Sequence, residues 1–168
     1  MDAAASSLSY VSVKSGEIAE TNTFSGLSGG VTPDGAASLQ IDLATVETKV
    51  DIRNERMRDI FFEVADNPTA TVTADIDPAA FETLGVGESL AQTLKATLSV
   101  KGVEAPVDTQ VAVTRTAEDG VIVTSTEPVI VYADALELTQ GLETLQELAG
   151  LPSITPVVPV SFSIAFKR

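Results

Sequence analysis

The chain has 168 residues, a formal net charge of −14, and neither cysteine nor histidine. Its length is typical of one domain, and its hydrophobic content of 44% is too high for a disordered chain. The charge argues against nucleic acid and anionic membranes as partners, because both require a basic surface. Without cysteine and histidine, disulfides, zinc sites of the Cys/His type, Ser-His-Asp triads and Cys-His dyads are excluded.

No stretch of the sequence predicts a membrane-spanning helix, because the most apolar region, 154–166, is short and interrupted by prolines. Small residues follow Met1, in the order Asp2-Ala3-Ala4-Ala5. They are typical of a mature chain whose signal peptide has been removed, with Met1 added for expression. We therefore expect a disordered or tag-like segment at 1–5, one domain at 6–168, and a periplasmic or secreted location.

Apolar and polar residues alternate along much of the chain, which is typical of half-buried strands. The stretch 38–46 is the clearest example, with Leu39, Ile41 and Leu43 on one face. We expect further strands at 8–14, 17–31, 70–76, 89–100, 106–115, 121–126 and 157–166. Glycines inside the stretch 17–31 indicate bends of the kind that barrels need at their corners.

Two segments show helical spacing instead. Within 46–64, Met57, Ile60 and Phe61 lie three or four residues apart and would share one face of a short helix. The segment 134–149 predicts a second helix that lies on the sheet. Its apolar stripe consists of Leu138, Leu142, Leu145 and Ala149. Asp134 is its expected N-cap and Gly150 its expected C-cap.

The first helical segment resembles the signature of the YceI-like family, which are small lipocalin-like barrels that bind polyisoprenoid lipids. The family pattern is an Arg-Asp-x-His-Leu-Arg run followed shortly by Phe-Phe-Asp-Val. The matching residues are Arg53-Asn54-Glu55-Arg56-Met57-Arg58 and Phe61-Phe62-Glu63-Val64. Arg56 replaces the histidine and the spacer is one residue shorter, so no role of that histidine is carried over.

A second motif, a Leu-Thr-x-x-Gly-Val-Thr-x-Pro-Val hairpin, resembles residues 98–107, with Ser99 and Glu104 in place of the two threonines. The resemblance covers nearly all of 6–168. Periodicity alone does not separate a barrel from a sandwich. The resemblance implies an all-β fold, an antiparallel eight-stranded lipocalin-like barrel with two short helices.

A barrel of this size is wide enough to be filled by side chains or to hold one ligand. A lipid tail needs little more than an aliphatic lining, since each buried CH₂ contributes about 0.8 kcal/mol. The in-phase candidates for this lining are Leu39, Ile41, Leu43, Leu94, Leu98, Val100, Val111, Phe162 and Ile164. A closed, dry core is the alternative that periodicity leaves open.

Four of the ten cationic residues gather in the first helical segment: Lys49, Arg53, Arg56 and Arg58. Arginines are well suited to a quinone carbonyl or a pyrophosphate. A head group at the barrel mouth would therefore meet Arg53, Arg56, Phe61 and Phe62. The alternative is a solvated helix face that pairs with the acidic residues of the same segment.

The sequence predicts a non-enzymatic protein that binds, stores or transports a long-chain isoprenoid lipid, either a polyprenyl lipid or an isoprenoid quinone. No metal and no other cofactor is expected, since the acidic pairs at turns lack the spacing of a calcium loop. A structural or interaction module with a filled barrel is one alternative. An enzyme that uses carboxylates or Tyr10 and Tyr132 is another. We expect no nucleic acid and no membrane insertion, and the oligomeric state, a homodimer included, stays open.

Overall fold

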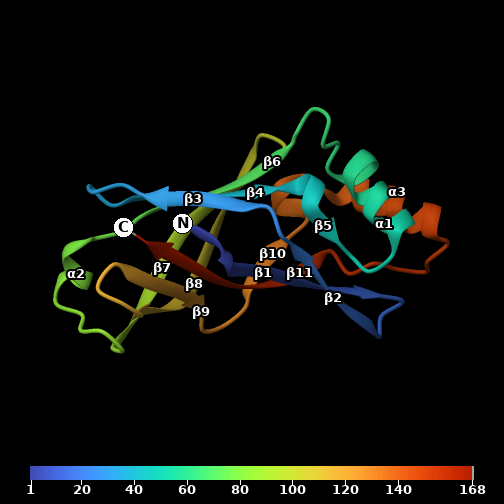
Figure 1. Ribbon diagram of the computed structural model, residues 1–168. Helices are drawn as coiled ribbons and strands as arrows, with labels where there is room; N and C mark the ends of the chain where they lie inside the picture. The colour runs from blue at the N-terminus through green and yellow to red at the C-terminus, as the bar shows by residue number, and fades with distance from the viewer. Residues whose placement is uncertain (168) are drawn as a thin grey trace.

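The computed structural model describes residues 1–167 and shows an elongated molecule built on an eleven-stranded antiparallel sheet (Figure 1). Its strands are β1 (Asp2–Lys14), β2 (Ile18–Phe24), β3 (Leu27–Val31), β4 (Ala36–Asp42), β5 (Val46–Glu47), β6 (Thr69–Asp75), β7 (Ser89–Val100), β8 (Val103–Arg115), β9 (Gly120–Ser125), β10 (Val129–Tyr132) and β11 (Val157–Lys167). The hydrogen-bonded order is β3-β4-β6-β7-β8-β9-β11-β1-β2-β5, and β10 pairs with β11 beside this path. The strands β3 and β5 stand at the two ends of this order and do not pair with each other, so hydrogen bonds do not close the sheet.

Short helices lie at the two ends of the sheet (Figure 1). At one end are α1 (Asp51–Arg56), the π-helix η2 (Met57–Phe61) and α3 (Thr139–Ala149), and at the other end is α2 (Ala79–Glu82). Two 3₁₀ turns, η1 (Leu43–Thr45) and η3 (Asp134–Leu136), complete the set. The Phe62 N–H donates to the Met57 carbonyl, five residues back, at 2.9 Å. Such π-turns within helices are uncommon and are frequent at functional sites.

The predicted class, all-β with antiparallel strands, is confirmed, but the closed eight-stranded barrel is wrong. The expected strand 17–31 is divided into β2 and β3, and the sequence does not predict β5 or β10. The division occurs beside Gly26, where a Cβ atom would lie 2.7 Å from both Asp42 Cβ and Thr45 Cγ2. Only a residue without a side chain fits so close to the β4–β5 connection, and the chain bends there.

Two other expectations differ from the structure. β1 begins at Asp2, so residues 2–5 lie in a strand and not in a disordered segment. The second helix begins at Thr139, because Glu137 has a left-handed φ of 56° that separates η3 from α3. Gly150 ends α3 with φ of 62°, as predicted, since glycine adopts this conformation without strain.

Candidate functional site: an internal apolar cavity

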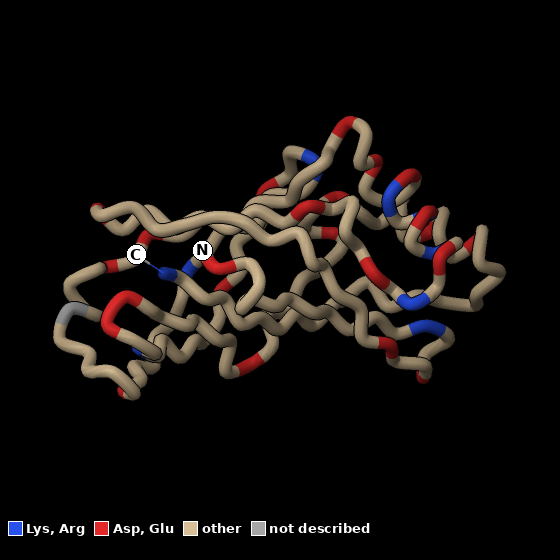
Figure 2. Tube along the Cα trace, in the orientation of Figure 1, with Lys and Arg blue, Asp and Glu red and all other residues tan. Residues whose placement is uncertain are grey.

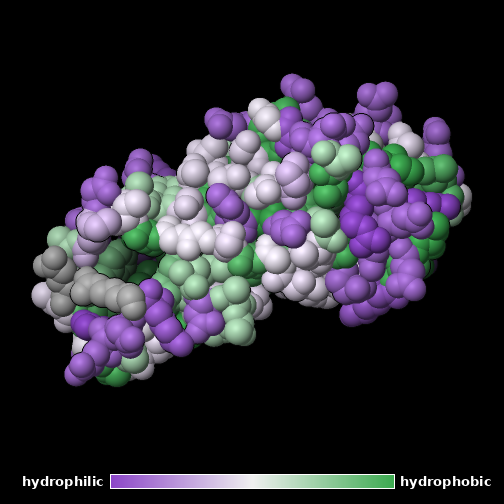
Figure 3. All heavy atoms as spheres, turned by 45° about the horizontal axis from the view of Figure 1, so that its top comes forward, coloured by the Kyte–Doolittle hydropathy of each residue, from purple (hydrophilic) through white to green (hydrophobic). Residues whose placement is uncertain are grey.

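A cavity of about 670 Å³ runs through the interior of the molecule. Its lining includes the exposed Ile52 of α1 and Leu148 of α3, and Val31 and Ile76 near α2. The cavity therefore extends along the sheet from the α1 and α3 end to the α2 end. Figure 3 shows the surface hollowed at the α2 end, with hydrophobic residues inside the hollow. The side chains therefore do not fill the interior of the molecule.

The walls of the cavity are aliphatic and aromatic, and most of the residues predicted for it lie there. Its lining includes Leu39, Ile41, Leu43, Leu94, Leu98, Val100, Phe162 and Ile164 from the predicted wall, and Arg53, Arg56, Phe61 and Phe62 from the predicted mouth. Val111 is the exception, because it is buried but is not part of the lining. That the residues lie in the wall follows from strand phase, and their contact with a ligand stays a prediction.

The helix α3 forms part of the cavity wall, and does not merely lie on the outside of the sheet. Its apolar stripe, Leu138, Leu142, Leu145 and Ala149, lines the cavity. Gly141 allows the close approach of α3 to η2, since a Cβ at this position would lie 3.1 Å from Phe61 Cδ2. The helix α3 therefore covers one end of the sheet, which would otherwise be exposed.

Four aromatic rings link the helical end to the sheet. Phe61 and Phe62 meet edge to face with ring centroids 4.9 Å apart, and Phe62 meets Phe24 at 5.9 Å. Phe24 in turn lies 5.6 Å from Tyr10. Such pairs contribute about 0.5–1.5 kcal/mol each beyond the area they bury. The Phe-Phe pair of the signature thus anchors η2 to β1 and β2 and forms part of the cavity wall.

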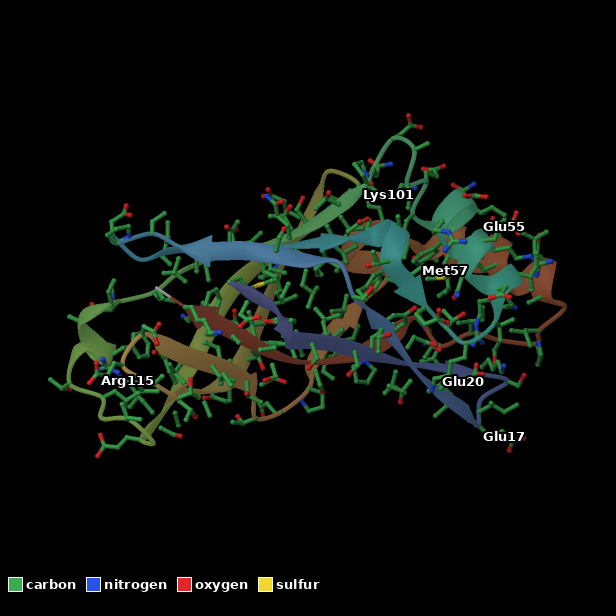
Figure 4. All side chains as sticks on the ribbon, viewed as in Figure 1. Glu17, Glu20, Glu55, Met57, Lys101 and Arg115 are labelled. Atoms are coloured by element: carbon green, nitrogen blue, oxygen red, sulfur yellow. The ribbon has the colours of Figure 1, made fainter. Side chains whose placement is uncertain are left out.

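Polar side chains of the lining concentrate at the β1–β2–α1 end. The polar residues at this end include Tyr10, Ser12, Lys14, Glu20, Asn22, Thr48, Arg53 and Arg56, and the lining also contains Ser38, Thr109 and Thr155. Acidic and basic residues are intermingled at this end (Figure 2), and Glu20 and Met57 lie at it whereas Arg115 lies at the α2 end (Figure 4). One end of the cavity is therefore the more polar one, and it holds every charged side chain of the lining.

Glu20 on β2 is the centre of this polar end. Its Oε2 lies 2.6 Å from Arg53 Nη1 and 2.9 Å from Lys14 Nζ. The hydrogen bond from Arg53, and then the one from Lys14, lower the pKa of the Glu20 carboxyl. Arg53 therefore pairs across to β2, and not with the acidic residues of its own segment as the solvated-face alternative required.

Arg53 is held in place by its neighbours. Its Nη2 donates to the Thr48 carbonyl, and Thr48 in turn is fixed by Asn54, whose Oδ1 accepts from the Thr48 N–H at 2.8 Å and from Thr48 Oγ1 at 2.6 Å. Arg56 donates from Nη1 to the Leu148 carbonyl at 3.2 Å and joins α1 to α3. Lys49 is exposed, so the four cations of the segment are not one site.

Tyr10 and Asn22 are site residues that the sequence analysis did not select as lining. Asn22 is only 2% exposed, and its side chain points to the same face of β2 as Phe24. Burial raises the pKa of the Tyr10 hydroxyl, and the charge of Arg53 partly opposes this rise. The available signal was an asparagine at an apolar position of an alternating strand, two residues before Phe24.

Other kinds of site are not found in the described part of the chain. Among the side chains that the structure describes, no group of three or more acidic residues is arranged to hold a metal ion. None of the helices there is both long enough and apolar enough to span a bilayer. The fold and the site define a β-sheet protein with an apolar internal cavity that is polar at one end.

Comparison with known proteins agrees with this class. The model of the YceI-like domain matches residues 1–166. A polyisoprenoid-binding domain from Saccharophagus degradans, implicated in plant cell wall breakdown, is 42% identical, with a TM-score of 0.96 over 99% of this chain and 96% of that one. The chain belongs to the YceI-like family.

More distant structures share the fold. BcnA from Burkholderia cenocepacia is 20% identical, with a TM-score of 0.72 over 98% of each chain. A YCEI protein from Campylobacter jejuni is 12% identical, with a TM-score of 0.63 over 88% of this chain and 84% of that one. No curated protein matches the chain.

Proposed function

We propose that this protein binds one long-chain isoprenoid lipid, with the tail in the cavity and the head group beside Arg53, and that it catalyses no reaction on it. The observation that carries the proposal is the apolar cavity of about 670 Å³ whose charged lining side chains all lie at one end. The polyisoprenoid-binding domain that is 42% identical to this chain supports the same class of ligand.

Burial of hydrocarbon supplies the affinity in this proposal. Each CH₂ group that leaves water contributes about 0.8 kcal/mol, so a tail of a dozen carbons can reach micromolar affinity even after the losses of association. The cavity contributes shape and exclusion of water, and no chemical step is needed. Storage or transport of the lipid follows from reversible binding of this kind.

The direction of the lipid follows from the two ends of the cavity. Near α2, the lining residues Val31, Ile76 and Phe166 are apolar and suit the end of a tail. Near α1, the charged and amide side chains around Glu20 suit a polar head. Both a polyprenyl lipid and an isoprenoid quinone have this polarity.

Native mass spectrometry of the purified protein tests the proposal. We expect a mass excess that organic extraction removes and that is released as a prenyl lipid. A delipidated sample should regain a single equivalent of an added C20 or longer prenyl lipid. A protein that carries no lipid and takes up none would refute the proposal.

A further inference from the structure

Two buried polar atoms at the polar end of the cavity have no hydrogen-bond partner within the described residues. They are Asn22 Oδ1 and Arg53 Nε. Both side chains line the cavity, and both contact Glu20, through its backbone carbonyl and its carboxylate respectively. Buried polar atoms in native proteins are nearly always paired, so each of these two atoms is a position at which a further partner is expected.

The Asn22 amide is held in one orientation. Its Nδ2 donates to Ser12 Oγ at 3.0 Å and to the Glu20 carbonyl at 3.4 Å. Rotation of the amide by half a turn would place its oxygen against the Glu20 carbonyl, where two acceptors would meet. Asn22 Oδ1 is therefore an acceptor that lacks a donor.

The Arg53 guanidinium is partly used by the protein itself. Nη1 and Nη2 donate to the Glu20 carboxylate and Nη2 also donates to the Thr48 carbonyl, which leaves Nε as the unused donor. Glu20 also pairs with Lys14, and its single carboxylate compensates only one of the two positive charges.

The two atoms require opposite properties of a ligand. Asn22 Oδ1 needs a donor, and Arg53 Nε needs an acceptor. A hydroxyl group supplies the donor that Asn22 Oδ1 lacks, whereas a quinone carbonyl, an ether or an ester only accepts. An acceptor-only head group would leave Asn22 Oδ1 buried without a partner, which weakens binding.

We infer that the cavity selects isoprenoid lipids whose head group carries a hydroxyl, such as a prenol or the hydroquinone form of a quinone. The inference rests on the proposed function, since it specifies the head group of the same ligand. It makes Asn22 a specificity-determining residue and Arg53 its companion. The lipid tail gives the affinity, and the hydroxyl contact decides between lipids that have the same tail.

A pair of ligands with one tail tests the inference. The C20 prenol and its methyl ether differ in the hydroxyl donor, and their dissociation constants are measured on delipidated protein by titration calorimetry. We expect the prenol to bind the native protein about tenfold more tightly, which corresponds to about 1.4 kcal/mol. In Asn22→Leu the ratio should fall to about one, while the ether keeps its affinity. Gln110→Leu removes an amide from the exposed face of β8 and should leave the ratio unchanged.

If Asn22→Leu does not fold, the comparison of prenol and ether on the native protein still tests the inference. Equal binding of prenol and ether would overturn the inference, because a water molecule would then satisfy Asn22 equally well in both complexes. A preference that survives in folded Asn22→Leu would also overturn it. If neither ligand binds, the proposed function fails as a whole, so the two failures are distinguishable.

Discussion

The substitution Ala96→Phe tests whether the interior is an open cavity or a filled core. Ala96 lies on β7 opposite Ala74 on β6 and Val107 on β8, and all three line the cavity. These small neighbours leave the space in front of Ala96 open. A phenyl ring in Ala96→Phe would therefore occupy volume that the proposed lipid tail uses.

The expected effects on binding and on stability have different signs. A ring that displaces about six tail carbons removes on the order of 3–5 kcal/mol of binding free energy, or roughly 10²- to 10⁴-fold in affinity. In the ligand-free protein, the same ring fills empty apolar space, and we expect the free energy of unfolding to stay level or rise by up to about 2 kcal/mol. Urea unfolding and titration with a C20 prenol measure the two quantities.

The matched control for this test is Ala91→Phe, because Ala91 lies on β7 with its side chain exposed. Ala91→Phe should leave the prenol affinity and the free energy of unfolding unchanged. Overpacking of a filled core costs about 1–3 kcal/mol. A loss of stability of that size in Ala96→Phe, together with unchanged prenol binding, would show that the space is not there and would refute the reasoning.

Three further predictions concern the support of the site. The pKa of the Glu20 carboxyl is lowered by Arg53 and Lys14, so its contribution is present above the unfolded pKa near 4.3 and is lost as pH falls through the folded value. Glu20→Gln should therefore melt below the native protein at pH 7, with the difference shrinking as the pH falls below the unfolded pKa. Asn54→Ala removes the acceptor from Thr48 and should cost about 1–3 kcal/mol in urea unfolding. Gly26→Val should destabilise by at least about 1 kcal/mol, since its side chain meets the β4–β5 connection.

Each of these three predictions has a result that would contradict it. A Glu20→Gln difference that is as large at pH 3 as at pH 7 would contradict the assignment of the carboxylate. Native stability of Asn54→Ala would mean that water replaces its contacts with Thr48. A Gly26→Val protein as stable as the native chain would mean that the bend between β2 and β3 adapts to a side chain.

Strand phase predicts the cavity wall well because the side-chain period of a strand is local and simple. Leu39, Ile41 and Leu43 alternate with polar neighbours, and an observer can assign them to one face without knowing the fold. Whether that face meets another wall or an open space depends on long-range distances. The cavity therefore could be expected only from the family resemblance.

The missed parts of the site have physical reasons as well. Asn22 contributes to the site through Ser12 and Glu20, and the pairing of Asn22 with Tyr10 on β1 is visible only in the register of two strands. Arg53 finds its partner on β2, thirty-three positions away, and not among the nearby acidic residues that helical spacing suggested. Sheet closure likewise depends on the whole fold. The glycine at position 26 indicates a bend, but the sequence does not show whether the edge strands β3 and β5 will pair.

The most direct test of the account is an experimental structure of the protein with a bound C20 or longer prenol. We predict continuous tail density that begins beside Asn22 and Arg53 and runs through the cavity toward Ile76. An unoccupied cavity, or a lipid bound on the outer face of the sheet, would contradict the account.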